Sequence, residues 1–275
     1  MLEHGENLVN ELRLKAKNFR REILIMTSIA GSGHPGGSLS AIDFLTALYF
    51  HHMKIDPKNP GWKDRDRFIL SKGHAVPALY VVLAELGFFP KEELARFRKL
   101  GSILQGHPDM NITPGIEMST GSLGQGLSVS CGMSLAGRLD KKDFRVYCML
   151  GDGELDEGSV WEAAMAASHY KLDNLTAVLD RNEMQVDGTT EDVMCLEPLK
   201  GKWESFGWNV IEIDGHDMYQ ILETLDAVKD IKGKPTIIIA KTVKGKGISF
   251  MENKLEYHGT ALSSEELTRA LVELK

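Results

Sequence analysis

Residues 144–182 read FRVYCMLGDGELDEGSVWEAAMAASHYKLDNLTAVLDRN. The two apolar runs in this stretch, 144–150 and 174–179, have the composition of buried β-strands, and the segment between them, 159–170, has the apolar periodicity of a helix. Two strands joined by one helix lie parallel in a sheet, and the connection is right-handed. The stretch therefore predicts a βαβ unit at the centre of an α/β fold.

The same alternation of strands and helices extends over the rest of the chain. We expect a second helix that is capped by Ser40, because the glycine-rich segment 30–38 interrupts the first one. The sequence contains neither an internal repeat nor a linker, so it predicts a single domain over residues 1–275 with a mostly parallel sheet and helices on both faces. The other expected strands are 67–71, 209–213 and 236–241; the other expected helices are 6–28, 76–86, 91–99, 219–229, 264–275 and one that opens at 121–126 and runs to about 139.

Composition and charge exclude several classes of protein. The chain has 275 residues, of which 43% are hydrophobic, and its formal net charge is −7, which disfavours nucleic acid as the main partner. Three cysteines without metal-ligand spacing indicate reduced thiols. The first residues lack the apolar core of a signal peptide, and no apolar run has the length of a membrane helix. We therefore expect a cytoplasmic protein.

Polar residues follow both strands of the central βαβ unit. Asp152 comes after the first strand and Asn182 after the second, and the carboxyl ends of parallel strands meet at one edge of a sheet. A carboxylate, an amide oxygen and the main-chain carbonyl of Met184 are hard ligands of the kind that Mg²⁺ takes, usually together with phosphate oxygens. Gly153 and the helix that begins near Gly158 favour a phosphate group beside the metal.

A plainer interpretation is that Gly-Asp-Gly is a surface turn and that Asn182 only tolerates a left-handed loop conformation. The two features occur together at the ends of neighbouring strands, which favours the diphosphate–magnesium site. A nucleotide site is disfavoured, because neither G-x-G-x-x-G after the first strand nor G-x-x-x-x-G-K-[ST] is present.

Six collinear segments carry a family resemblance. The segment 151–188 resembles the thiamine-diphosphate motif of transketolases. The other five segments, which agree with this resemblance, are SGHPGGSLS at 32–40, SKGHA at 71–75, QGHPD at 105–109, TGSLGQG at 120–126 and YHG at 257–259. Because they span nearly the whole chain in order, they are far more specific than a lone Gly-Asp-Gly.

The resemblance implies a role for each matching residue. Asp152, Asn182 and the Met184 carbonyl would hold Mg²⁺, or Ca²⁺ or Mn²⁺ in its place, and Gly153 would contact the cofactor diphosphate. The catalytic residues would be four histidines, two of which, His74 and His258, would also bind the cofactor. The remaining implied residues are His34 and His107, which would border the reacting carbonyl; Gly121, Ser122 and Leu123, which would meet the cofactor rings; and Glu157, which would bind cofactor and, with Glu162, lie near a subunit interface.

Other polar residues have plainer interpretations. The pair Glu157 and Glu162 is equally well explained as two solvated acids near a helix N-terminus. Five histidines outside the motifs are expected to be solvated side chains, and the sequence has no spacing typical of a zinc site. These five are His4, His51, His52, His169 and His216.

Two departures from full-length transketolases bear on function. Lys244 and Lys246 stand where those enzymes carry apolar and aromatic residues. Similar lysines occur in deoxyxylulose-phosphate synthases and in two-chain transketolases. The resemblance also implies that two domains of full-length transketolases lie on another chain. They are the pyrimidine-binding domain, which supplies the glutamate that activates the cofactor, and the C-terminal domain.

The resemblance therefore implies the N-terminal subunit of a split transketolase. It would transfer a two-carbon ketol unit from a ketose phosphate to an aldose phosphate with thiamine diphosphate, in an α2β2 heterotetramer with a C-terminal subunit. The alternatives are another two-chain thiamine-diphosphate enzyme, acting on a different sugar or a 2-oxo acid, and a catalytically silent cofactor-binding module.

Overall fold

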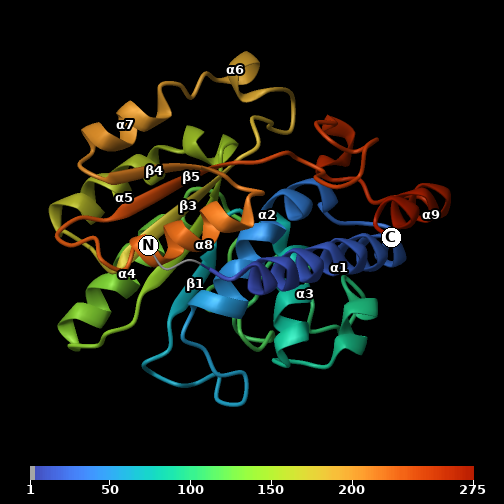
Figure 1. Ribbon diagram of the computed structural model, residues 1–275, viewed down its shortest axis with the longest axis horizontal. Coiled ribbons are helices and arrows are strands. Elements are labelled where there is room, and N and C mark those ends of the chain that lie inside the picture. Colours follow the sequence, from blue (N-terminus) through green and yellow to red (C-terminus); the bar gives the residue numbers. More distant parts are fainter. Residues whose placement is uncertain (1–3) are drawn as a thin grey trace.

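A five-stranded parallel sheet forms the centre of the computed structural model, which describes residues 4–275. The strand order is β1-β2-β3-β5-β4, and all four neighbouring pairs are parallel (Figure 1). The middle strand, β3, is buried along its full length, as expected of a parallel sheet that is covered on both faces. The strands are β1 (Arg67–Leu70), β2 (Val146–Gly151), β3 (Leu175–Arg181), β4 (Asn209–Asp214) and β5 (Thr236–Lys241).

Successive residues of each strand contribute to two different cores. On β2, Tyr147 and Met149 belong to one apolar cluster, whereas Val146, Cys148 and Leu150 belong to the other. This alternation follows from the two-residue period of a strand and confirms the prediction of helices on both faces.

The helices divide between the two faces. The larger cluster includes α1 (Glu6–Ala30), α2 (Pro35–Ala47), α3 (Val76–Leu86) and α8 (Met218–Ala227), and the smaller one α4 (Gly126–Leu139), α5 (Gly158–His169) and α7 (Leu199–Ser205). The remaining helices are α6 (Thr190–Val193) and α9 (Ser264–Glu273), the second of which contacts α1.

Two of the expected helices differ from the structure. The second helix begins at Pro35 rather than after Ser40, with His34 as its N-terminal flanking residue. A methyl group at Gly36 would lie 2.8 Å from the Tyr257 carbonyl, so a close backbone contact retains glycine inside the helix despite its low helix propensity. The helix expected over 91–99 is a short 3₁₀ segment, Lys91–Arg96.

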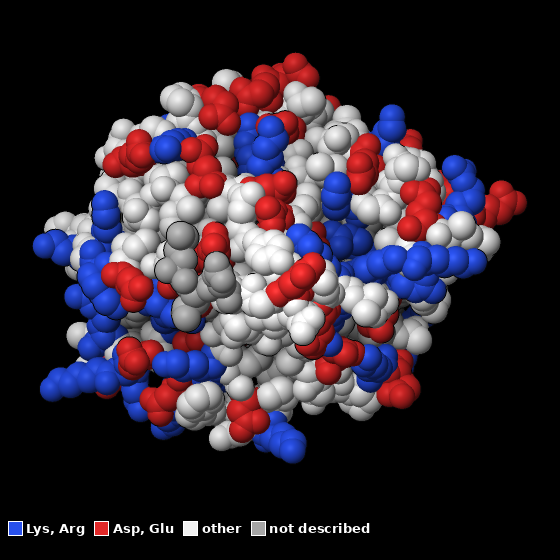
Figure 2. Space-filling model, viewed as in Figure 1, with Lys and Arg blue, Asp and Glu red and all other residues white. Residues whose placement is uncertain are grey.

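The surface features agree with the composition. Acidic and basic side chains are interspersed over the face in Figure 2. Within residues 4–275, no helix combines the length and the apolar character that a membrane crossing requires. The three cysteines, Cys131, Cys148 and Cys195, are free thiols.

Candidate active site

A cavity of about 220 Å³ lies at the carboxyl ends of β2 and β3. Asp152 and Asn182 both line it, so the crossover between adjacent parallel strands brings the two predicted polar residues to one site. Gly153 and Met184 line the same cavity, and residues from the loops after β1 and β5 close it. The rim is therefore built from four of the five strand ends.

Asp152 is held by the backbone on both sides. Its Oδ1 accepts from the Gly153 amide at 2.9 Å, and its Oδ2 accepts from the Glu183 amide at 2.6 Å. Burial, reinforced by the negative charge of Asp180, raises the pKa of Asp152 to about 6. A carboxylate in such surroundings gains from a divalent cation beside it, because the cation offsets both the desolvation and the repulsion.

Asn182 presents its amide oxygen in a fixed direction. The amide nitrogen donates to Asp180 Oδ2 at 3.1 Å, and the oxygen accepts from the Met184 amide at 3.3 Å. Together with the Asp152 carboxylate and the Met184 carbonyl, this gives a set of oxygen donors that fits a small hard cation.

A buried ion pair supports the cavity. Asp180, which is fully buried on β3, accepts from the ammonium group of Lys72, from the Ser40 hydroxyl at 2.7 Å and from the Thr242 hydroxyl at 2.6 Å. Burial favours the neutral carboxyl, but Lys72 outweighs it and lowers the pKa of Asp180. Lys72 also donates to the Gly37 carbonyl at 3.0 Å, so this pair connects β3 to the start of α2.

Lys244 is a second cation in the cavity. It is 2% exposed, and it lies 2.7 Å from His258 Nδ1 and 3.4 Å from the Met184 carbonyl. Burial, together with the charge of Lys72, lowers the pKa of Lys244 to about 8. An anion between the two lysines would relieve this repulsion, which fits the oxygens of a diphosphate.

The sequence alone predicts no role for Asp180 or Lys72. Two features of the sequence could have indicated them: Asp180 lies inside an otherwise apolar strand, and Lys72 directly follows another strand. Each is buried in the structure, and buried ionised groups are rare unless they are paired.

Four predicted histidines gather beside the cavity. The ring centroid of His34 lies 5.2 Å from that of His74, 6.2 Å from that of His107 and 5.6 Å from that of His258. Burial lowers the pKa of all four, to about 4 for His34 and about 3 for His258. The cluster is therefore uncharged near neutral pH, with ring nitrogens that can donate to or accept from a ligand.

The loop before α4 contacts this cluster. Gly121 has a φ of +143°, and a methyl group there would lie 2.9 Å from His107 Cδ2. Leu123 lines the cavity, whereas Ser122 is exposed and is not among its lining residues.

Glu154 attaches this loop to the strands. Its buried carboxylate accepts from the Ser71 hydroxyl, from the Gly124 amide at 2.8 Å and from the Gly151 amide at 3.0 Å. The sequence alone predicts no role for Glu154, although it lies two positions beyond Asp152.

The two remaining acids lie outside the cavity lining. Glu157 is exposed at the N-terminus of α5, and Glu162 is exposed on the same helix. The five other histidines do not all match the expected solvated state. His52 is buried and bonds the Tyr147 hydroxyl at 2.8 Å, and His216 is partly buried beside Asp43 at 2.7 Å. His4 is also partly buried, with its Nε2 3.0 Å from Asp226 Oδ2.

Comparison with known proteins identifies the family. Over residues 14–274 the chain matches the family described as transketolase, thiamine diphosphate binding domain. The chain belongs to this family. Its fold agrees, because transketolases from Leishmania mexicana and Campylobacter jejuni superpose with TM-scores of 0.90 at 31% and 35% identity. These matches confirm both the predicted fold and the family resemblance.

Relatives of two lengths match this transketolase domain. A 6-deoxy-6-sulfo-D-fructose transketolase subunit from Clostridium sp. (strain MSTE9) is 48% identical over 100% of the chain and 96% of the relative. An apulose-4-phosphate transketolase subunit from Phocaeicola vulgatus is 45% identical over 97% of the chain and 94% of the relative. Human transketolase is 43% identical, and the match covers 96% of the chain but 42% of that protein. The chain likewise spans about two fifths of the solved transketolases, 41% and 43% in the two above.

Proposed function

We propose that this chain is the N-terminal, diphosphate-binding subunit of a two-chain transketolase, and that residues 1–275 form its single domain. It would transfer a two-carbon ketol unit from a ketose phosphate to an aldose phosphate. The observation that carries the proposal is the combination, in one cavity, of the oxygen donors Asp152 and Asn182 with the buried cations Lys72 and Lys244.

The donor set fits Mg²⁺, or Ca²⁺ or Mn²⁺ in its place. Asp152, the Asn182 amide oxygen and the Met184 carbonyl would hold the cation, and Lys72 and Lys244 would neutralise the diphosphate. Gly153 lacks a side chain at the point where the diphosphate would approach the backbone. Thiamine diphosphate, when bound, supplies the carbon centre that accepts the ketol unit.

The histidines would bind and orient the sugar. Because the Lys244 ammonium group only donates, His258 Nδ1 accepts, and the ring proton of His258 resides on Nε2. This nitrogen can donate to a ligand oxygen. His34, His74 and His107 are uncharged neighbours with nitrogens for sugar hydroxyls, and a neutral imidazole can take or return a proton at a carbonyl oxygen. Gly121 and Leu123 would support the cofactor rings.

A second chain would complete the active site. Two relatives that the chain matches over nearly their whole length are named as subunits. Human transketolase is more than twice as long as the segment that this chain matches. We infer a partner with the pyrimidine-binding and C-terminal domains, in an α2β2 assembly in the cytoplasm. Exposed apolar side chains on and beside α4 and α5 support a partner on this side: Leu139, Met165 and Tyr170 are 81%, 54% and 51% exposed. Glu157 and Glu162 would lie near that interface.

The donor and acceptor sugars separate this proposal from its nearest rival. The relatives named above act on a sulfosugar and on apulose 4-phosphate, according to their names. The assay is ketol transfer by the reconstituted pair with xylulose 5-phosphate and ribose 5-phosphate, and in parallel with a sulfonated ketose and with apulose 4-phosphate. We expect turnover with the pair and none with this chain alone. Robust turnover by the lone chain would contradict a split enzyme.

A silent cofactor-binding module is the rival from another class. Such a module would bind thiamine diphosphate but yield no transfer with any of these sugars. Calorimetry tests the site itself: Asp152→Ala in the assembled complex should abolish the Mg²⁺-dependent part of thiamine diphosphate affinity. Asp140→Ala, on an exposed acid, is the matched control. Unchanged affinity in Asp152→Ala would mean that the metal site is elsewhere.

A further inference from the structure

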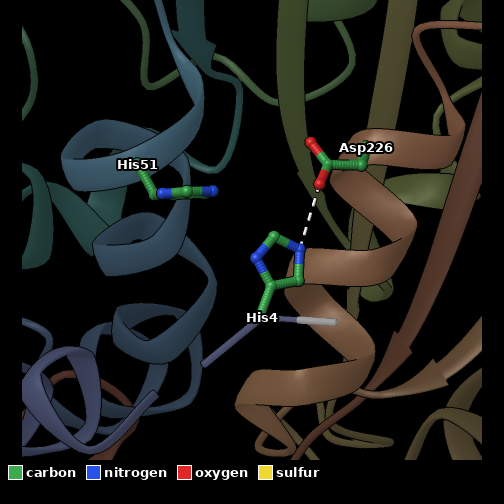
Figure 3. A group of neighbouring side chains, drawn as sticks. All are labelled: His4, His51 and Asp226. Atoms are coloured by element: carbon green, nitrogen blue, oxygen red, sulfur yellow. Dashed lines mark ion pairs between the residues drawn. The ribbon is translucent and has the colours of Figure 1, made fainter. Parts of the chain in front are cut away.

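His4, His51 and Asp226 meet near the C-terminal end of α2. The histidine cluster of the candidate active site lies at the other end of this helix, where His34 precedes it. Each offers one ligand atom, and the three atoms lie within 4.8 Å of one another. The residues come from three separate elements: the segment before α1, the turn η1 (Leu48–His52) that continues α2, and α8 (Figure 3). No sequence spacing could have indicated this group, because its members lie 47 and 175 positions apart.

The side chains converge on one point. In Figure 3, Asp226 and His51 reach from facing helices into the gap where the His4 ring lies. His4 Nε2 is 3.0 Å from Asp226 Oδ2, and the His4 and His51 rings meet edge to face with centroids 5.2 Å apart. Ligand atoms around a tetrahedral zinc ion are about 3.4 Å apart. The ion would therefore require the exposed His51 side chain to move toward His4 and Asp226 on binding.

The surroundings orient the carboxylate. Lys229 donates to Asp226 Oδ1 at 3.0 Å, so only Oδ2 faces the two histidines. A ligating group that is fixed by an outer hydrogen bond is typical of metal sites in proteins. The side chains of His4 and Asp226 are 7% and 24% exposed, whereas His51 is exposed and leaves one side open to water.

The backbone of η1 gives an independent indication. It is a π-helical turn, in which the Met53 amide bonds the Leu48 carbonyl at 2.8 Å, and π-turns within helices occur frequently at functional sites. Next to His51, His52 is buried, and its Nδ1 has no hydrogen-bond partner although it lies 3.9 Å from Asp226 Oδ1.

We propose that His4, His51 and Asp226 bind a divalent transition-metal ion of the zinc class, which fastens the segment before α1 to η1 and α8. Two imidazole nitrogens and one carboxylate oxygen are ligands that zinc takes, and water would complete a tetrahedral shell. The ion would stabilise the fold, because it joins groups that come together only in the folded chain.

The test is a Co²⁺ titration of the untagged, EDTA-treated protein in complex with its partner, followed by the visible absorption of tetrahedral Co²⁺ and by competition with Zn²⁺. Thiamine diphosphate and Mg²⁺ are kept saturating so that the catalytic rim is filled. We expect one Co²⁺ per chain at this site, displaced by Zn²⁺. At a free concentration about a hundredfold above the dissociation constant, Zn²⁺ should raise Tm by about 5 °C.

Variants distinguish the site from others. His51→Ala, His4→Ala and Asp226→Asn should each weaken Co²⁺ binding by at least about tenfold. His169→Ala, on an exposed histidine of α5, is the matched control and should leave Co²⁺ binding unchanged. Identical Co²⁺ binding by the wild type and His51→Ala would overturn the proposal, as would a wild-type protein without a tetrahedral Co²⁺ spectrum. Since the readout is metal binding and Tm, neither outcome depends on transketolase activity.

Discussion

The buried ion pair between Lys72 and Asp180 is a sensitive point of the structure. Lys72 and Asp180 are each 1% exposed. Asp180→Asn removes the negative charge but keeps the size of the side chain, so Lys72 is left as a buried cation without its ion-pair partner. Breaking a buried pair in this way costs about 3–5 kcal/mol in the free energy of unfolding. With a urea m-value of about 3 kcal/mol/M, the midpoint should fall by at least about 1 M.

The exposed pair Lys200–Glu212 provides the control. Its atoms are 3.2 Å apart and its side chains are 54% and 55% exposed. Glu212→Gln should change the free energy of unfolding by less than about 1 kcal/mol. Urea unfolding followed by tryptophan fluorescence measures both variants.

A double-mutant cycle tests the physical cause. Lys72→Met combined with Asp180→Asn removes both charges, so the double variant should be less destabilised than the sum of the two single variants by about 1–3 kcal/mol. Additive single effects, or an Asp180→Asn midpoint equal to that of Glu212→Gln, would refute the reasoning. The double variant should bind thiamine diphosphate more weakly than the wild type even where its stability is recovered, because one of the two cations in the cavity is absent.

Three further changes should give measurable effects. Lys244→Met should weaken thiamine diphosphate binding by roughly 10–100-fold in calorimetry, the value of one charge-assisted hydrogen bond, while the exposed-lysine control Lys241→Met should leave it within about twofold. The pKa of Asp43 is lowered to about 2, because its guanidinium and imidazole neighbours outweigh burial. Its stabilisation is complete above about pH 5 and is lost as pH falls through 2, so it should contribute about 2 kcal/mol to acid unfolding, and Asp43→Asn should lack that part of the slope. Gly73→Ala would place a methyl group 2.7 Å from the Thr120 hydroxyl and should lower Tm by several degrees; an unchanged Tm would mean that the loop yields freely.

The elements that sequence predicted best are those with strong apolar patterns. The helix expected over 76–86 and the strand expected over 236–241 have the bounds found for α3 and β5. The positions of Asp152 and Asn182 followed from topology alone, because parallel strands bring their carboxyl ends to one edge. Local pattern and chain connectivity were sufficient in these cases.

Features that depend on distant contacts were not predictable from local pattern. Helix α2 begins at Pro35 and includes Gly36, whose close approach to the Tyr257 carbonyl, 221 positions away in sequence, leaves no space for a side chain. An acidic residue at position 180, inside an otherwise apolar strand, is explained only by its ion pair with Lys72, which is 108 positions away. The expectation that His4, His52 and His216 are solvated was wrong for the same reason. Their partners, Asp226, Tyr147 and Asp43, are also remote in sequence.

Helix α2 is buried on every side, and the residue before it belongs to the histidine cluster. Its amide protons should therefore exchange with deuterium only when the whole molecule opens, and not by fraying. A fully buried helix of this kind tolerates few substitutions, because almost any change of side chain would disturb the packing. We therefore expect changes in ligand preference to arise at the mouth of the cavity, where the sequence can change without loss of the fold.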